Sequence, residues 1–399
     1  MRIAIYNDWW SPQLVGGAER TALDLAQELC VSFGRDNIHV YTLSNSKNTH
    51  SEIVDDIHVS RLSSGTLRTE FSVGVFTKLF EKLRILLDTR TQRIVAAEIL
   101  KFQPDVVVLH NVDRLGLRFS SYFHSISNIP LVRIQHDLGD TCIYRTRVRK
   151  TTRRNCIDSC RSCKLKEGFY RKESTNYRLM LSVSEFVETS LCRFKFSPQE
   201  SNFGYPKKIM SAFESEHFSF GNASDVRLGF VGRVVPEKGI ETVLRSLFIL
   251  KSHHNKTVSL TICGAGDKKY LKRLRLVASE LSIDLVMLGY DKDPFELLRG
   301  KIDAVVVSST WQEPLGRVPM EAIGHGFPCF VSGIGGLIES KNFLTGPLVY
   351  FEPADADDLA KKIANAIDVG IPISSPKVTN NTLSGILVEF CHSIESRSL

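Results

Sequence analysis

The stretch DAVVVSSTWQEPLGRVPMEAIGHGFPCFVSG, residues 303–333, decides the fold class. It opens with one apolar run, 303–309, and closes with another, 328–333. Between the two runs, Pro319 suits the first residue of a helix, because proline has no N–H to leave unpaired there. A strand, a helix and a second strand in this order form the unit from which parallel sheets are built.

The same alternation of apolar runs and amphipathic segments continues along the chain. Short Val, Ile and Leu runs are typical of strands that are buried on both faces. They predict strands at 2–7, 38–43, 105–110, 130–136, 227–232, 259–264, 284–289, 303–309 and 328–333. Helices are predicted at 17–33, 89–102, 114–125, 239–252, 267–281, 294–300, 319–325, 356–368 and 382–395. The chain is therefore predicted to be an α/β protein with two Rossmann-like domains.

A segment rich in Ser, Gly, Asn, Phe and Pro, residues 194–225, separates the two series of strands. It predicts a hinge at about residue 210, because domain boundaries fall in such segments. The predicted domains are 1–210, with a Cys-rich basic insertion at 140–172, and 211–375. A final helix is predicted within 376–399, with the N-terminal domain as its candidate packing partner.

The composition excludes several classes of protein. Of 399 residues, 43% are hydrophobic and 24% are charged, which is typical of globular domains. No apolar run approaches the roughly 20 residues that a membrane-spanning helix needs. Because MRIAIYND runs from Met1 directly into a strand, no signal peptide is predicted, and a cytoplasmic protein is expected.

Positive charge is concentrated in one segment. Residues 145–172 contain eleven Lys or Arg and two acidic residues, a net charge of +9, whereas the whole chain carries +7. Nucleic acid is disfavoured as a partner, because the segment has no recognisable aromatic–basic platform. Contact with an anionic membrane surface or with a lipid-pyrophosphate acceptor fits better, at about 1 kcal/mol per basic residue near the surface. The segment 73–90 is a second candidate for membrane contact, although such an apolar stripe is more often packed in a core.

Two glycine-containing loops follow predicted strands. GGAER, residues 16–20, opens a helix, so Gly16 and Gly17 could let backbone N–H groups approach a phosphate or sugar. CGAGD, residues 263–267, places Gly264 in a tight turn after a strand of the second domain. The alternative for both loops is an ordinary turn.

Two cations lie in GRVVPEKG, residues 232–239, at the carboxyl edge of the second predicted sheet, where open α/β sheets bind ligands. Arg233 offers a planar fork and Lys238 a mobile point charge, which together suit a diphosphate. The alternative is a solvated basic loop.

Two carboxylates flank the start of the helix in the opening stretch. The backbone amides near Leu315, Gly316 and Arg317 could hold a phosphate. Glu321 could then accept hydrogen bonds from vicinal hydroxyls such as those of a ribose, and Glu313 from a second sugar. This spacing fits a ligand made of a sugar, a diphosphate and a nucleoside, and the alternative is one capping acid and one exposed acid.

These motifs in this order resemble the family-4 glycosyltransferases, whose fold is GT-B, two Rossmann-like domains facing each other across a cleft. The matching stretches are GGAER at 16–20, QHD at 135–137, VSEF at 183–186, GFVGRVVPEKGIETVL at 229–244, ICGAGD at 262–267 and EPLGRVPMEAIGHGFPCFVSGIGGLIE at 313–339. One departure is SAFE at 211–214, where the family usually reads Asn-Gly-[Ile/Val]-Asp.

The resemblance implies roles for the matched residues. Arg233 and Lys238 would stabilise the leaving nucleoside diphosphate, Glu321 would bind the ribose and Glu313 the transferred sugar. His136 would reach the donor sugar, and Gly16 and Gly17 would let acceptor and donor phosphate meet. The resemblance also implies retention of anomeric configuration without a catalytic metal.

Four cysteines fall in the basic insertion: Cys142, Cys156, Cys160 and Cys163. Their spacing predicts a structural zinc site, because Cys-x2-Cys ends suit tetrahedral Zn²⁺. Scattered thiols and a redox pair are the alternatives.

The sequence thus predicts a retaining glycosyltransferase that uses a nucleoside-diphosphate sugar. The expected acceptor is a glycan, lipid-linked, in surface polysaccharide biosynthesis at the cytoplasmic membrane face. One alternative is another enzyme on the same fold, such as a sugar-nucleotide epimerase. A second is a zinc-stabilised protein that binds polyanions or membranes without catalysis.

Overall fold

The computed structural model describes most of the chain. The described residues are 1–12, 16–44, 46, 48–63, 88–116, 118–142, 145–148, 155–156, 158–206, 217–218, 225–374 and 381–397. They form two compact units: unit 1 comprises residues 1–145, 158–208 and 380–399, and unit 2 comprises 146–157 and 209–379. The predicted hinge near residue 210 and nearly all of the segment 73–90 lie outside the described residues.

Unit 1 is built on a sheet with the strand order β3-β4-β2-β1-β5-β6-β7-β8. The strands are β1 Ile3–Tyr6, β2 Ile38–Ser44, β3 His50–Val54, β4 Ile57–Ser63, β5 Val106–Leu109, β6 Leu131–Gln135, β7 Leu179–Ser182 and β8 Glu200–Phe203. Only β3 runs antiparallel to its neighbour among these strands. Strands β2 to β4 lie on one side of β1, and β5 to β8 lie on the other. The switch point of unit 1, where the strand order changes sides, is therefore between β1 and β5.

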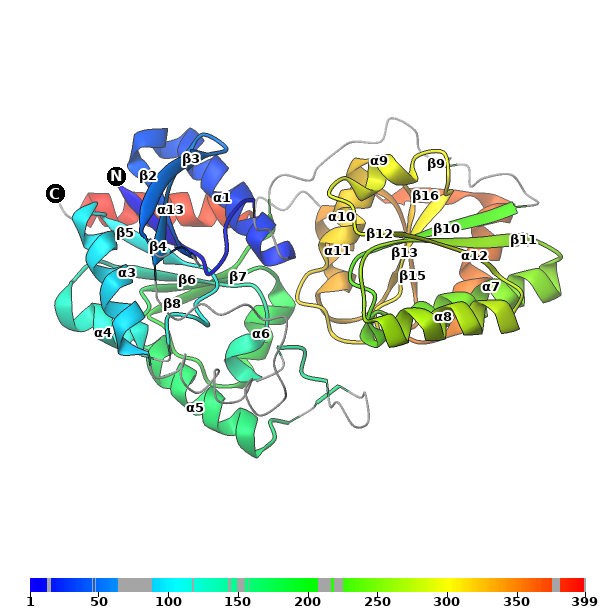
Figure 1. Ribbon diagram of the computed structural model, residues 1–399, viewed down its shortest axis with the longest axis horizontal. Coiled ribbons are helices and arrows are strands. Elements are labelled where there is room, and N and C mark those ends of the chain that lie inside the picture. Colours follow the sequence, from blue (N-terminus) through cyan, green and yellow to red (C-terminus); the bar gives the residue numbers. More distant parts are fainter. Residues whose placement is uncertain are drawn as a thin grey trace. The chain divides into compact units, whose positions relative to one another are not determined.

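The helices of unit 1 are α1 Gly17–Phe33, α3 Thr89–Lys101, α4 Phe119–Ile126, α5 Arg161–Ser174, α6 Glu185–Arg193 and α13 Leu383–Arg397, with 3-10 turns η1 Arg35–Asn37 and η2 Gly139–Thr141. The last helix of the chain, α13, packs against the first, α1 (Figure 1). Every residue of β1, β5, β6 and β7 is buried, as expected for parallel strands covered on both faces.

Unit 2 is built on a second sheet, with the strand order β12-β11-β10-β13-β14-β15-β16-β9. The strands are β9 His217–Phe218, β10 Asp225–Val231, β11 Thr257–Cys263, β12 Asp284–Gly289, β13 Ala304–Val307, β14 Cys329–Ser332, β15 Gly346–Phe351 and β16 Ile371–Ser374. The first six strands in this order pair in parallel, and β16 and β9 add antiparallel pairs at one edge.

The helices of unit 2 are α7 Ile240–His254, α8 Lys268–Glu280, α9 Pro294–Leu298, α10 Arg317–Gly324, α11 Ser340–Phe343 and α12 Ala356–Val369, with 3-10 turns η3 Pro236–Lys238 and η4 Gly335–Glu339. Its switch point lies between β10 and β13, because β11 and β12 follow on one side of β10 and β13 lies on the other. The two α/β units with mainly parallel sheets confirm the predicted fold class.

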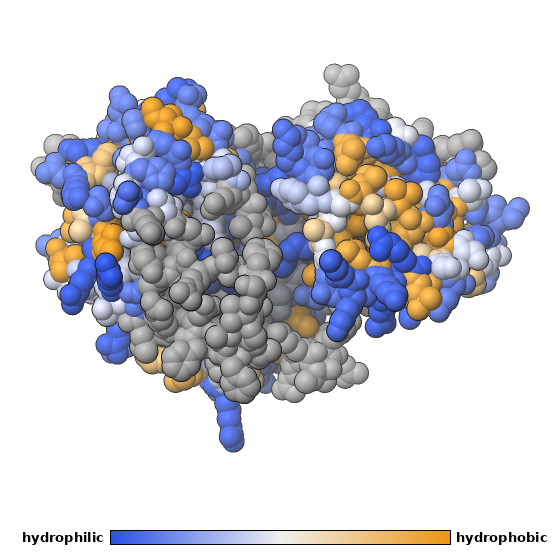
Figure 2. All heavy atoms as spheres, in the orientation of Figure 1, coloured by the Kyte–Doolittle hydropathy of each residue, from blue (hydrophilic) through white to orange (hydrophobic). Residues whose placement is uncertain are grey.

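Strand β12 is the free edge of the second sheet, and its residues are at least partly exposed. Figure 2 shows apolar residues gathered on the visible face of unit 2, over the part where Figure 1 draws α8 and β12. Leu276 of α8 and Val286 of β12 are among the exposed apolar side chains. This surface lies along the sheet edge and not at the carboxyl ends of the strands.

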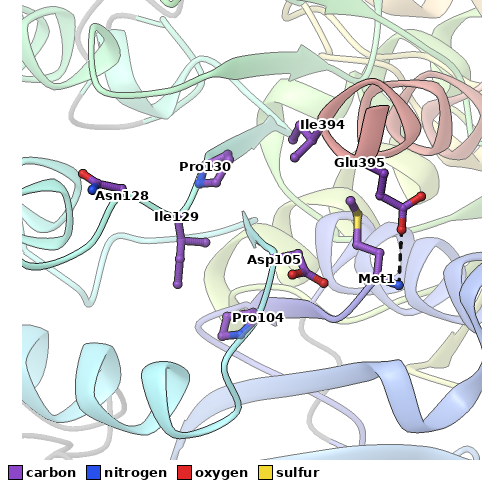
Figure 3. A pocket seen from close by; sticks show the side chains of 8 residues that line it. All are labelled: Met1, Pro104, Asp105, Asn128, Ile129, Pro130, Ile394 and Glu395. Carbon is purple, nitrogen blue, oxygen red and sulfur yellow. Dashed lines mark ion pairs between the residues drawn. The ribbon is translucent and has the colours of Figure 1, made fainter. Parts of the chain in front are cut away.

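A cavity of about 860 Å³ lies at the amino-terminal edge of the sheet in unit 1 (Figure 3). It is lined by Met1, Pro104, Asp105, Asn128, Ile129, Pro130, Ile394 and Glu395. The amino group of Met1 forms an ion pair of 3.4 Å with Glu395 of α13. Because ligands of α/β sheets bind at the carboxyl ends of the strands, this cavity lies at the edge opposite to the expected site.

Among the described residues, no helix combines the length and the apolarity that a bilayer-spanning segment requires.

Candidate active site

The loops at the switch point of unit 2 bring together three of the predicted motifs. The loop after β10 contains η3, the loop after β13 covers 308–316, and η4 follows β14. These three strands are neighbours in the sheet, and all run in parallel, so their exit loops meet at one edge. The sequence prediction that these loops form one site in unit 2 depends on this adjacency.

A buried ion pair joins the first two loops. The Nζ atom of Lys238 lies 2.6 Å from Oε1 of Glu313, and the exposed fractions of these side chains are 15% and 8%. The hydroxyl of Ser309 donates a second hydrogen bond to the same carboxylate oxygen. Charged groups held so far from water are costly unless each is paired and hydrogen-bonded. Here the pair fixes an ammonium group at the carboxyl edge of the sheet.

Backbone contacts hold the same loops in register. Thr310 donates its N–H to the carbonyl of Glu237 at 2.9 Å, and the hydroxyl of Ser308 donates to the carbonyl of Lys238 at 2.8 Å. The hydroxyl of Ser332, at the end of β14, donates to the carbonyl of Ser309 at 2.8 Å. Side chains on such a braced frame lose little entropy when they bind a ligand.

Helix α10 begins beside this pair. Its first residue is Arg317, so Pro319 is the third helical residue and not the first as predicted, although it still lies in the first turn, where its missing N–H costs nothing. Gly316 is the N-cap, and among the described residues no side chain caps the helix. The first N–H groups of α10 are therefore suited to an anion.

The second predicted carboxylate, Glu321, lies on α10. Its Oε1 accepts a hydrogen bond of 3.1 Å from Nε of Arg317, one turn earlier on the same helix. Both side chains are largely buried, at 17% and 13% exposure. Glu313 and Glu321 thus have different cationic partners, Lys238 and Arg317, and do not face each other as an acid–base pair.

The remaining predicted residues of unit 2 lie in the loops after β10, β11 and β13. Arg233 is exposed in the loop after β10, and Leu315 is buried in the loop after β13. A Cβ atom at Gly264 would lie 1.8 Å from the carbonyl oxygen of Gly232, so only glycine allows the two loops to approach this closely.

The switch point of unit 1 carries a separate polar cluster. His136, directly after β6, is buried, and its Nε2 lies 2.8 Å from Nδ1 of His110, which follows β5. The two rings stack with centroids 5.0 Å apart. Burial, followed by the influence of His136, holds the pKa of His110 well below its usual value, so His110 is neutral at pH 7. His136 is therefore held by a neutral neighbour.

Two carboxyl groups at this edge have raised pKa values. Burial raises the pKa of Asp8, after β1, to about 6, although hydrogen bonds from the Tyr6 hydroxyl and the Arg114 N–H oppose this shift. Burial likewise raises the pKa of Asp137, beside His136, to about 6, against a hydrogen bond from the Gly139 N–H. Groups perturbed in this way are concentrated at functional sites.

Gly16 and Gly17 lie at the start of α1, with Gly16 as its N-cap and both residues exposed. In the same motif, Glu19 is buried and accepts a hydrogen bond of 3.1 Å from the side chain of Asn111, after β5. The start of α1 is thereby attached to the switch point of unit 1.

Sequence reasoning missed several residues of these clusters, among them Ser309 in unit 2 and Asp8, Glu19, His110 and Asp137 in unit 1. A usable signal was present for most of them. Asp8, His110 and Asp137 each stand one or two residues after a buried strand, in IAIYND, VVVLHN and RIQHD. Polar residues at strand exits in a parallel sheet converge on one edge.

The predicted zinc site is not supported. All four cysteines of the predicted set are free thiols, with Cys142 and Cys163 buried, Cys156 half-buried and Cys160 exposed. Across the described part of the chain, no three His, Cys, Asp or Glu side chains are grouped so that they could hold a metal ion. Spacing along the chain predicted a tetrahedral set, but the fold gives these thiols different environments.

The thiol of Cys160 differs from the others. Hydrogen bonds from the side chain of Ser162, 3.4 Å away, and from the backbone and side chain of Cys163 lower its pKa to about 7. In contrast, burial raises the pKa of Cys192, on α6.

Comparisons with known proteins show which family and which fold the chain is similar to. Residues 213–378 match the family model of the glycosyl transferases group 1. An uncharacterized 42.6 kDa protein in the cps region of Klebsiella pneumoniae is 34% identical over 154 residues, which cover 36% of this chain and 38% of that protein. The chain thus aligns with little more than a third of the length of this curated relative.

Two solved structures are similar over their whole length. HepE of Anabaena, in complex with UDP and glucose, has a TM-score of 0.64 at 17% identity, with 100% of both chains covered. The lipopolysaccharide outer core galactosyltransferase WaaB has a TM-score of 0.62 at 14% identity, again with 100% of both chains covered. At this identity the likeness concerns the fold, which is GT-B as predicted. The residues that match the family model, 213–378, lie in unit 2 and contain the Lys238–Glu313 pair, so unit 2 of this chain belongs to the glycosyl transferases group 1 family.

Proposed function

We propose that this protein is a retaining glycosyltransferase that transfers a sugar from a nucleoside-diphosphate sugar to a glycan. The observation that carries the proposal is the Lys238–Glu313 pair beside the uncapped start of α10, at the switch point of a unit that belongs to a glycosyltransferase family. An ammonium group and free helix N–H groups are the donors that a diphosphate needs.

In the proposed site, each residue contacts one part of the donor. Lys238 and Arg233 bind the diphosphate, together with the N–H groups near Leu315, Gly316 and Arg317. Glu321 binds the ribose hydroxyls, and Glu313 binds hydroxyls of the transferred sugar. Gly264 allows the loop after β11 to pack directly against the loop after β10.

From unit 1, His136 is proposed to contact the donor sugar, and Gly16 and Gly17 to let the acceptor approach the phosphate. The bond between the acceptor oxygen and the anomeric carbon forms on the face from which the diphosphate leaves, which retains the configuration. The departing phosphate oxygen takes the proton of the acceptor hydroxyl. The residues of unit 2 stabilise the negative charge that grows on this oxygen.

The proposed donor is a UDP-sugar, since HepE was solved with UDP and glucose. We expect UDP-glucose to raise the melting temperature of the protein, whereas GDP-glucose and ADP-glucose should have smaller effects. A ligand at a hundredfold excess over its Kd stabilises the folded state by about 2.7 kcal/mol. Thermal unfolding with each nucleotide sugar measures this effect.

The matched control for the donor experiment is a pair of variants. Glu321→Ala should abolish most of the shift, whereas Glu280→Ala, an exposed glutamate on α8, should leave it unchanged. Equal shifts in both variants, or no shift with any of the three nucleotide sugars, would contradict the proposed donor site. Donor consumption without glycan formation would instead identify an epimerase.

The proposed acceptor is a lipid-linked glycan of a surface polysaccharide. Two similarities support this: the relative encoded in a cps region and the structural likeness to a lipopolysaccharide galactosyltransferase. Such an acceptor is presented at a membrane, so the enzyme is proposed to act at the cytoplasmic membrane face.

The exposed face of α5 supports membrane contact. Leu165 and Phe169, one turn apart, are 67% and 39% exposed. Four exposed cations of the same helix accompany them: Arg161, Lys164, Arg171 and Lys172. Its two acids are engaged elsewhere, because Glu167 accepts from Ser159, and Glu173 is buried against Ser120 and Ser121. Apolar side chains among cations are typical of a helix that lies on an anionic bilayer.

We expect the protein to sediment with vesicles of phosphatidylcholine and phosphatidylglycerol but not with phosphatidylcholine alone. Replacing Lys164 and Lys172 by Glu should weaken binding at least about tenfold, because each cation contributes about 1 kcal/mol. The control replaces Lys268 and Lys269, two exposed residues of α8, by Glu and should have no effect. Equal loss in both double variants would refute a specific role of α5.

A further inference from the structure

Two of the four clustered cysteines lie at the start of α5. Cys160 is the N-cap of this helix, and Cys163 is its third residue. Residues at these two positions lie close together, because they belong to the same first helical turn. This placement is the one that a disulfide between residues three apart at a helix start requires.

The environments of these two thiols differ in a useful way. Cys160 is exposed, so a reagent in solution can reach it, whereas Cys163 is buried and is protected from direct attack. The hydroxyl of Ser162, 3.4 Å from the Cys160 sulfur, adds a hydrogen bond that favours a reactive thiolate. An accessible sulfur beside a buried one is the arrangement in which one thiol reacts and the other resolves.

No other role on the described chain accounts for this pair. It is not part of a metal-binding group within the described residues. A cysteine held only for packing would be buried, but Cys160 is exposed.

We propose that Cys160 and Cys163 form a redox-active thiol pair, in which hydroperoxides oxidise Cys160 and Cys163 converts the product into an intramolecular disulfide.

The chemistry has two balanced steps. The Cys160 thiolate attacks one oxygen of the peroxide, the O–O bond breaks, and Cys160 becomes a sulfenic acid while the peroxide leaves as alcohol or water. The Cys163 thiol then attacks the sulfenic sulfur, the S–S bond forms, and one water leaves. The peroxide has accepted two electrons, and a dithiol reductant returns the pair to its reduced form by thiol–disulfide exchange.

Cys192 provides the matched control for reactivity. It is an exposed cysteine of the same unit, near the end of α6, and its thiol donates a hydrogen bond to the carboxylate of Glu188 at 3.7 Å. A neighbouring carboxylate disfavours the thiolate, so Cys192 should react slowly.

The test treats the full-length protein with hydrogen peroxide, blocks the remaining thiols with N-ethylmaleimide after denaturation, and maps peptides by mass spectrometry. We expect a peptide in which Cys160 and Cys163 are joined, while Cys192 is alkylated. Oxidation of Cys160 should be at least about tenfold faster than that of Cys192. When dithiothreitol is added before N-ethylmaleimide, both Cys160 and Cys163 should be recovered as alkylated cysteines.

Three variants separate the two roles. In Cys163→Ser, Cys160 should accumulate as a sulfenic acid that dimedone labels, because no thiol resolves it. In Cys160→Ser, Cys163 should stay unlabelled because it is buried, and Cys192→Ser should behave as the wild type. Circular dichroism confirms that each variant is folded.

Several outcomes would overturn the proposal. One is equal oxidation of Cys160 and Cys192, and another is a disulfide from Cys160 to Cys142 or Cys156 in place of Cys163. A third is stoichiometric zinc in the purified protein, bound so that its removal by a chelator is needed before Cys160 reacts.

Discussion

Replacing Lys238 by Ala is expected to lower kcat and kcat/KM together by a factor of about 100 to 1000, the effect of removing one preorganised donor from a developing oxyanion. The Nζ atom of Lys238 is held 2.6 Å from Glu313 and so needs little reorganisation when the diphosphate leaves. An interaction made mainly with the transition state lowers both parameters equally. Steady-state kinetics with a saturating acceptor measure the two parameters.

The control for this substitution is Lys361→Ala, at an exposed position of α12, which should keep wild-type kinetics. A second variant tests whether Lys238 only neutralises Glu313, because Lys238→Ala leaves that carboxylate buried with Ser309 as its hydrogen-bond donor. If neutralisation were its whole role, Glu313→Gln in the Lys238→Ala background would raise activity. We expect the double variant to be no more active than Lys238→Ala. A recovery of activity in the double variant would contradict the proposed role of Lys238 in stabilising the departing diphosphate.

Replacing Gly336 by Ala is expected to lower the activity of the same proposed site by displacing the loop that carries Glu313. A Cβ atom at Gly336 would lie 2.0 Å from the carbonyl oxygen of Pro314, and this backbone position cannot yield without moving the loop that carries Glu313. The Gly336 N–H also donates to the carbonyl of Glu313 at 2.7 Å. A displacement of about 1 Å in a positioning loop can cost a hundredfold in rate, and overpacking costs about 1–3 kcal/mol of stability.

Gly333 provides the matched control, three residues earlier. A Cβ atom there would lie 3.6 Å from its nearest neighbour, the carbonyl oxygen of Phe351, which is an ordinary contact. Gly333→Ala should therefore keep near-normal turnover and melting temperature, whereas Gly336→Ala should lose at least about a hundredfold in turnover. If the two variants had the same activity, the close packing of η4 on the loop after β13 would not be what positions Glu313.

The sequence predicted the central strands and most helices of both units. Apolar runs placed β1, β5, β6 and β13 within one or two residues, because strands buried on both faces need a continuous aliphatic pattern. It also predicted the loops of the unit-2 site, since ligand-binding residues of parallel sheets follow strands directly.

The strands that were missed are of two kinds. Three are interior and largely buried, so their short apolar runs were overlooked: β4, β7 and β15. The others lie at sheet edges. Strand β8 reads ESNF and is largely exposed, and β3 at the opposite edge reads HSEIV and is exposed as well. Edge strands with one neighbour carry no apolar signal, so only tertiary pairing defines them. Helix α5 was predicted only as part of a basic, Cys-rich insertion, because its sequence, RSCKLKEGFYRKES, is mostly polar and has no clear apolar face.

The sequence by itself thus determined two α/β units, the family of the second unit, and which loops lie at the carboxyl edge of its sheet, because these follow from local hydrophobic patterns and motif spacing. Only the tertiary structure decided that Lys238 pairs with Glu313, 75 residues later in the chain, that His110 lies against His136, and that Cys160 is exposed while Cys163 is buried. The physical reason is that strand order and burial are set by packing among distant segments, and spacing along the chain does not encode that packing.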